Sequence, residues 1–262
     1  MIKRLLFYWY ANSEDFINRF SLLHLYSLNL YKDIFDKKTF VISMDNPETD
    51  TILYEYTTRV ILSVVPDAEF IKVRNNSEYA SEAYWFKTEF IPNLYKYKNE
   101  AVFWCHGKGK GGLRYTGKKD LYIWISALYY MNLCSEKVIE DFINNDNTYM
   151  MGTMLYLINV WPYCSWHYNG GFYWMKPEKI GEYISTHETN LQTALNCDTW
   201  ERRYVAEGFP GIVFKEGGHC VMLGKHYNCC LDKFDIDSHI TYIKENCPNI
   251  KGFEDLYGQF IE

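Results

Sequence analysis

Short apolar runs alternate with segments of helical periodicity along the first part of the chain. Four runs rich in aromatic and β-branched residues have the pattern of buried strands: residues 4–10, 38–44, 69–73 and 101–105. Three stretches between them predict helices, the last with Pro92 placed to kink it: residues 13–30, 49–64 and 78–96. This alternation predicts an α/β fold whose mostly parallel, doubly wound sheet is flanked by helices.

The second part of the chain continues with less regular elements. Three helices are expected, the second capped by Ser135: residues 119–133, 135–144 and 177–185. Short apolar segments predict three further strands: residues 148–157, 170–175 and 211–214. Residues 200–206 are expected to be helical or irregular, and the tail from residue 232 should form one or two surface helices. No linker divides the chain, so we expect one domain over residues 1–262.

The most informative stretch is residues 101–112, where the buried run AVFWC ends in HGKGKGG. A buried strand that leads into a basic, glycine-rich loop indicates a ligand site at the carboxyl end of an α/β sheet. The expected ligand is a phosphate or diphosphate, with His106 as hydrogen-bond donor and Lys108 as point charge. The alternative is an exposed, solvated turn. The glycine spacing follows the fourth strand, which does not suit a dinucleotide fingerprint, and no P-loop sequence is present.

A second dense stretch, WHYNGGFYW at residues 166–174, places paired glycines between aromatic residues. Gly170 and Gly171, after Asn169, permit positive φ and close backbone approach, and the flanking rings suit stacking on a sugar. The alternative is a strand that enters the core through a tight turn. The aromatic content of 18% fits a sugar site or an aromatic-rich core equally well.

A third stretch, residues 198–211, sets carboxylates beside arginines. A carboxylate can act as a general base, and arginines can orient it or hold a diphosphate. Glu207, just before Gly-Phe-Pro-Gly, is a better candidate than Glu201 or Asp198. The alternative is a surface helix with ion pairs spaced i,i+4.

Charge and cysteine content narrow the function classes. The net charge of −6 disfavours a general nucleic-acid surface, although lysines gather locally at positions 108, 110, 118 and 119. The eight cysteines are scattered, and no signal peptide precedes them, so we expect reduced thiols in a cytoplasmic protein. No apolar run reaches the ~18 residues needed to cross a bilayer. Zinc is disfavoured because the candidate ligands fit no standard spacing: His219, Cys220, His226, Cys229 and Cys230.

With these stretches in order, the chain resembles a glycosyltransferase of the GT-A type, a nucleotide-diphospho-sugar transferase. It is most similar to a subgroup with a His-x-Lys-Gly motif after the central strand, then His-x-x-Gly-x-Phe-x-Trp, then a Glu before a turn. Here these are residues 106–109, 167–174 and 206–211. The resemblance covers roughly residues 1–215 and implies a Rossmann-like GT-A fold. It divides the chain into a nucleotide-binding half (1–112), an acceptor and catalytic half (113–215) and a C-terminal tail (216–262).

The resemblance implies transfer of a sugar from a UDP- or GDP-sugar donor to a hydroxyl of a glycan acceptor, with inversion. The donor would be held by strand ends and the basic loop: Tyr8, Trp9, Tyr10, Asp45, Arg74, Lys87, His106, Gly107 and Lys108. The sugar and acceptor would contact residues of the second stretch: His167, Asn169, Gly170, Gly171 and Trp174. Glu207 would be the general base, and Arg203 would orient it or contact phosphate. Glu201 is the next candidate for the base.

One departure from the family matters for metal dependence. His106 and Lys108 stand where an Asp-x-Asp motif would hold a divalent cation, and hard cations prefer oxygen ligands. We therefore predict no required cofactor; Asp45 leaves a role for Mn²⁺ or Mg²⁺ open. Two other classes remain: a carbohydrate-binding protein of the same fold that has lost catalysis, and a nicotinamide-dependent oxidoreductase that uses the glycine loop.

Overall fold

The computed structural model describes residues 1–12, 19–75, 81–107, 119–153, 155–161, 163–168, 170–197 and 204–223. Several residues singled out above lie outside these ranges: Lys108, Asn169, Asp198, Glu201 and Arg203. The expected helices of the tail also lie outside them. Those predictions stay predictions.

A seven-stranded sheet forms the centre of the fold, with strand order β3-β2-β1-β4-β8-β5-β9. Its first four strands are parallel and match the expected ones closely: β1 (Ile2–Tyr10), β2 (Lys37–Met44), β3 (Glu69–Arg74) and β4 (Glu100–His106). The other three are short: β8 (Tyr173–Met175), β5 (Met150–Thr153) and β9 (Cys220–Leu223). β8 runs antiparallel to β4 and β5, and β9 runs parallel to β5. The predicted α/β fold with a mostly parallel sheet is confirmed.

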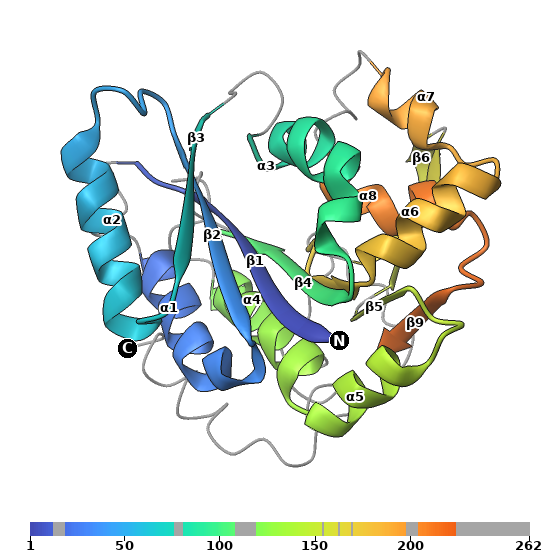
Figure 1. The fold of residues 1–262 in the computed structure, drawn as a ribbon, viewed down its shortest axis with the longest axis horizontal. Coiled ribbons are helices and arrows are strands. Elements are labelled where there is room, and N and C mark those ends of the chain that lie inside the picture. Colours follow the sequence, from blue (N-terminus) through green and yellow to red (C-terminus); the bar gives the residue numbers. More distant parts are fainter. Residues whose placement is uncertain are drawn as a thin grey trace.

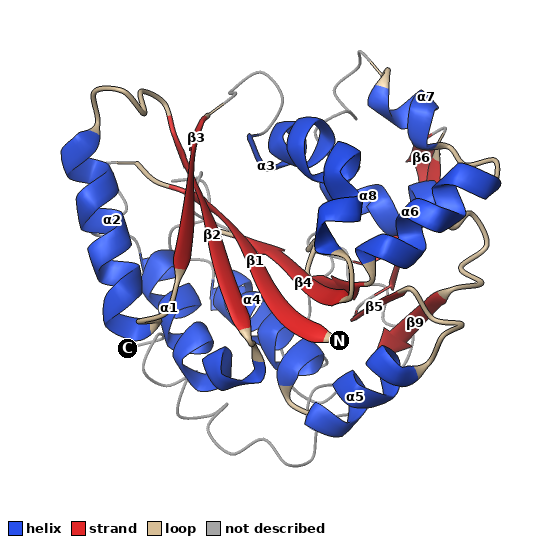
Figure 2. Cartoon of the chain, in the orientation of Figure 1, coloured by secondary structure: helices blue, strands red, loops and turns tan. Residues whose placement is uncertain are grey.

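Helices cover both faces of this sheet (Figures 1 and 2). One face carries α1 (Arg19–Tyr31), α2 (Thr51–Val64), α4 (Lys119–Leu133) and α5 (Glu136–Asn144). The other carries α3 (Ser81–Trp85), α6 (Pro177–Thr186), α7 (Leu191–Leu195), α8 (Val205–Val213) and two helical turns after α3. A separate hairpin joins β6 (Leu155–Trp161) to β7 (Cys164–Tyr168). Sheet strands buried on both faces explain the unbroken apolar runs of the sequence.

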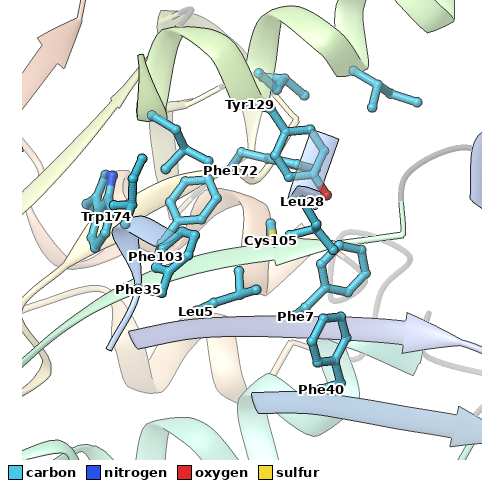
Figure 3. Close-up of a cluster of buried hydrophobic side chains, with 14 of the residues drawn as sticks. Leu5, Phe7, Leu28, Phe35, Phe40, Phe103, Cys105, Tyr129, Phe172 and Trp174 are labelled. Carbon is cyan, nitrogen blue, oxygen red and sulfur yellow. The ribbon is translucent and has the colours of Figure 1, made fainter. Parts of the chain in front are cut away.

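Successive side chains of the strands point alternately into two hydrophobic cores, one on each face of the sheet. Leu5 and Phe7 of β1 point to the first, together with Phe103 and Cys105 of β4, as Figure 3 shows. Trp104 points to the second, against helices on the opposite face. Both cores are rich in aromatic rings, so much of the aromatic content noted above is structural.

The structure corrects several expected elements. The helix at 78–96 divides into α3, a π-helical turn (η3, Phe86–Phe90) and a 3-10 segment (η4, Ile91–Tyr97). The strand at 148–157 divides into β5 and β6, which lie in different sheets. Residues 211–214, expected as a strand, belong mostly to α8, whose last six residues are all buried. Their local β preference is overridden by that tertiary burial. β7, β9 and α7 were not anticipated.

The described helices include none that is long and apolar enough to span a membrane.

Candidate functional site

The sheet has a point where its connectivity reverses, between β1 and β4. From β1 the chain continues to β2 and β3 on one side, and it returns to β4 on the other. In open α/β sheets, ligands bind in the crevice beyond the carboxyl ends of the strands at such a point. Tyr8 and His106 are paired in register there, and the Gly107 N–H donates to the Tyr8 carbonyl at 2.9 Å. The basic loop therefore leaves the sheet at the position where a ligand site is expected.

His106, the last residue of β4, contacts the glycine pair of the second stretch. Its Nε2 lies 3.0 Å from the Gly170 carbonyl oxygen. Because a carbonyl only accepts hydrogen bonds, this nitrogen carries the proton and donates. The ring also packs near Phe172, with centroids 5.8 Å apart. Two stretches 64 residues apart in sequence thus meet in one hydrogen bond.

Glu207 joins this contact from the third stretch. The Gly170 N–H donates to its Oε1 at 2.9 Å, so Gly170 binds His106 through one backbone group and Glu207 through the other. Glu207 lies in the first turn of α8, where the helix dipole favours a carboxylate. Its side chain is 19% exposed. A partly buried, oriented carboxylate at the end of the sheet is placed to take a proton from a bound hydroxyl.

His167 lies beside the same carboxylate. Its Nδ1 is 3.0 Å from the Tyr168 carbonyl oxygen and 3.8 Å from Oε1 of Glu207. The Nδ1 proton is therefore donated to the carbonyl, with Glu207 nearby. The His167 side chain is only 6% exposed, so it offers little surface to a sugar and lies beside the Glu207 carboxylate instead.

The turn at Gly170 and Gly171 requires glycine. Both residues have positive φ, 87° and 67°, which L side chains rarely adopt. A Cβ on Gly170 would lie 2.6 Å from Leu128 Cδ1, while one on Gly171 would face the His106 ring at 3.5 Å. The expected strand at 170–175 therefore begins only at Tyr173.

The position of α8 is fixed by side chains of β7 and β8. The Tyr173 hydroxyl donates to the Ala206 carbonyl at 2.6 Å, and Trp166 Nε1 donates to the Phe214 carbonyl at 3.2 Å. Burial raises the pKa of Tyr173, and the charge of Glu207 adds to that rise. Burial also raises the pKa of Cys164 to about 12, again with a contribution from Glu207. Both groups are thus neutral near pH 7.

A polar cluster lies at the carboxyl ends of the neighbouring strands. Asp45 follows β2 and accepts from the Tyr10 hydroxyl at 3.1 Å and from Asn75 Nδ2 at 2.6 Å. Arg74, at the end of β3, is exposed and pairs with Glu48 at 2.6 Å. Asp45 and Arg74 therefore lie at the predicted edge of the sheet.

Other expected ligand contacts are not available to side chains in this structure. Trp174 is fully buried in the first core (Figure 3). Its indole N–H donates to the Asn132 carbonyl. Tyr8 and Trp9 are each only 2% exposed. Alternation along a doubly covered strand explains why these rings face cores. The Lys87 ammonium bonds to the Leu195 carbonyl.

Two residues that position the site were not anticipated. Asn132 is buried on α4, and its Nδ2 donates to the Leu128 carbonyl at 2.7 Å and lies 3.4 Å from the Phe172 carbonyl. A polar residue within the apolar face of a helix was the available signal. No sequence signal marked Tyr173, which bonds α8 through its hydroxyl, because aromatic residues are common in strands.

The described residues do not assemble a metal centre. No group of three or more His, Cys, Asp or Glu among them is arranged to hold an ion. Nδ1 of His219 lies 2.9 Å from the Asn147 carbonyl oxygen. His226, Cys229 and Cys230 lie outside the described residues.

No protein-family model, curated protein sequence or solved structure matches this chain in the three comparisons made.

Proposed function

We propose that the protein is a glycosyltransferase that moves a sugar from a nucleotide-diphosphate-sugar donor to a hydroxyl of a glycan acceptor. One observation carries the proposal: Gly170 hydrogen-bonds both His106 at the end of β4 and Glu207 at the start of α8. The three stretches that resemble the family motifs are thereby brought to the switch point of the sheet.

The roles follow from the chemistry of each group. The diphosphate would lie beyond β1 and β4, where His106 and Lys108 offer hydrogen bonds and positive charge to the leaving group. The Glu207 carboxylate would take the proton of the acceptor hydroxyl as its oxygen attacks the anomeric carbon. The bond from that carbon to the diphosphate breaks, and the nucleotide diphosphate departs. Attack opposite the leaving group inverts the configuration.

The residues at the strand ends do not fit a hard divalent cation. Among the described carboxylates there, Asp45 already accepts from Tyr10 and Asn75, Glu48 pairs with Arg74, and Glu207 accepts from the Gly170 N–H. His106 donates to a carbonyl through Nε2. Mg²⁺ and Mn²⁺ need several oxygen ligands, so the described donor set is insufficient. The proposed transfer therefore uses side chains and backbone groups alone.

A thermal-shift screen tests the proposal. The intact chain is melted with UDP-, GDP-, CMP- and dTDP-sugars and with NAD, each in Mn²⁺ and in EDTA. A ligand at 100 times its dissociation constant stabilises by about 2.7 kcal/mol, a readily measured shift. We expect a shift with the sugars of one nucleotide, persisting in EDTA and lost in His106→Ala.

The control variant is Lys137→Ala, which removes an exposed charge on α5 and should keep the shift. A shift with NAD alone would favour the oxidoreductase. Sugar binding without any nucleotide response would favour a carbohydrate-binding protein. Loss of the shift in EDTA, restored by Mn²⁺, would contradict metal independence.

A further inference from the structure

A hollow lies at the other end of α8 from Glu207. It has a volume of about 290 Å³ and surrounds the C-terminal end of α8 and the turn before β9. We call it the α8–β9 pocket and define it by six of its lining residues: Tyr183, Glu188, Phe214, Lys215, Glu216 and His219. The Tyr149 N–H donates to the His219 carbonyl at 2.8 Å just before β5 begins, which places the pocket at the amino end of β5.

Packed rings form the apolar wall of the α8–β9 pocket. The Tyr183 ring stacks on His187 at 4.0 Å with an interplanar angle of 5°. His219 stacks in the same way on Tyr149, at 4.2 Å and 3°. Phe214 links the two pairs, with its centroid 4.8 Å from that of Tyr183. Because these rings already hold one another in place, ligand binding costs little side-chain conformational entropy.

The polar groups of the pocket are not used within the protein. Among the residues that the structure describes, neither Glu188 nor Glu216 has an ion-pair or hydrogen-bond partner for its carboxylate. The same holds, within those residues, for the Tyr183 hydroxyl and the Lys215 ammonium. Nδ1 of His219 donates to the Asn147 carbonyl, which makes Nε2 the acceptor of the neutral ring. Uncommitted donors and acceptors therefore belong to the residues that line a hollow with an aromatic wall.

This combination selects the class of ligand. Two carboxylates against one ammonium disfavour phosphates and other anions. The aromatic faces favour a ligand with an apolar side. The uncommitted donors and acceptors favour a ligand with many hydroxyl groups. The volume is at the low end for ligand pockets, ~300 Å³, and suits a single ring. We propose that the α8–β9 pocket binds one sugar ring, as a second carbohydrate site separate from the strand-end site.

The structure also connects the two sites. α8 begins beside the strand-end site, with Glu207 in its first turn, and its last residue Val213 lines the pocket. Six residues at 1.5 Å each put about 9 Å of helix between them. With the proposed function, the ring bound in the pocket would be a remote unit of the acceptor glycan. That identification rests on the proposed function, whereas binding of a sugar in the pocket does not.

The experiment measures sugar binding by the intact chain and by pocket variants. Titration calorimetry is performed with methyl glycosides of the common hexoses, N-acetylhexosamines and pentoses. We expect saturable binding of at least one glycoside, weakened about tenfold or more in E188Q/E216Q, because charge-assisted hydrogen bonds are lost. Tyr183→Phe, which removes only a hydroxyl, should weaken binding without affecting folding.

The matched control is E55Q/E136Q, which neutralises two exposed carboxylates on other helices and should bind as the wild type does. If no glycoside binds, or if binding is equal in E188Q/E216Q and the wild type, the pocket proposal is wrong. The nucleotide thermal shift, measured on the same variants, reports separately on the strand-end site, so either proposal can fail alone.

Discussion

At the scale of single residues, Glu207 is the group on which the proposed chemistry depends. It is held by the Gly170 N–H, it lies 3.8 Å from His167 Nδ1, and its charge acts on buried Tyr173 and Cys164. A carboxylate in such a setting has a defined orientation at the start of the reaction. General-base catalysis contributes roughly 10²–10⁴ to rate.

Glu207→Gln should therefore lower kcat by roughly 10²-fold or more, because the amide keeps the shape of the side chain but cannot take a proton. Turnover is measured with the donor found by thermal shift. The shift itself should persist, since Glu207 is not assigned to the diphosphate. Glu182→Gln, an exposed carboxylate on α6, is the control. Near-normal turnover would refute the assignment and move it to Glu201 or Asp198.

The sequence predicted some site residues better than others. Glu207, Gly170 and His106 were identifiable because charge, glycine and the end of an apolar run are unusual in these positions. Trp174 was expected near the sugar, because an aromatic ring in a glycine-flanked strand gives no sign of which face it occupies, but its ring is buried in the core. Its indole N–H is satisfied within the core, by the Asn132 carbonyl at 3.0 Å.

At the scale of elements, α8 decides where the candidate base lies. It packs directly on β7, and Gly211 permits the approach: a Cβ there would lie 1.9 Å from the Trp166 carbonyl oxygen. That neighbour is backbone and cannot rotate away. Cys164 Sγ and Gly208 O, 3.5 Å apart, mark the same close packing one turn earlier.

Gly211→Ala should destabilise the protein by about 3 kcal/mol or more, because overpacking here must shift α8 or β7. Urea unfolding gives the change. Gly181→Ala, in α6, is the matched control: its Cβ would meet Leu94 at an ordinary 3.7 Å. It should be neutral or stabilising by up to ~1 kcal/mol, since alanine favours helix. Equal midpoints for the two variants would contradict the packing argument.

Elements with strong periodicity were predicted well, and weak ones were not. The helix after Ser135 begins as expected, with the Val138 N–H 3.4 Å from the Ser135 hydroxyl oxygen. The segment at 211–214 was predicted as a strand, since Gly-Ile-Val-Phe has no helical period of its own. Burial of α8 between other elements supplied the deciding energy.

At the scale of the whole molecule, charges at the amino edge hold three parallel strands together. Arg4 on β1 binds Glu100 on β4 through two bonds, of 2.6 and 3.0 Å, and Lys37 on β2 lies 3.4 Å from the same carboxylate. The Glu100 side chain is 6% exposed. Burial alone would raise the pKa of Glu100, but Arg4 and Lys37 outweigh it and lower that pKa.

This lowered pKa gives a defined pH dependence. The unfolded chain has an ordinary Glu pKa near 4.3, so the folded state binds fewer protons just below that pH. The stabilisation from Glu100 is thus complete above about pH 4.3 and is lost as pH falls through the lower folded pKa. Glu100→Gln should cost about 3 kcal/mol at pH 7, because Arg4 loses the buried carboxylate that it binds through two bonds.

Urea unfolding between pH 7 and pH 3 tests this prediction. The difference between wild type and Glu100→Gln should shrink as the pH falls. Glu136→Gln, an exposed carboxylate, should follow the wild type throughout. A constant difference over the whole range would show that Glu100 acts by packing and not by charge.

Local patterns were enough to predict the α/β class, the four parallel strands and the stretches that carry the candidate chemistry. These depend on periodicity and on unusual residues, which are local properties of the chain. The packing of the elements, in contrast, brings His106, Gly170 and Glu207 together, turns Trp174 to the core, and forms a ring-lined pocket at the far end of α8. Contacts between residues far apart in sequence depend on how the elements pack, and the local sequence pattern does not specify that packing.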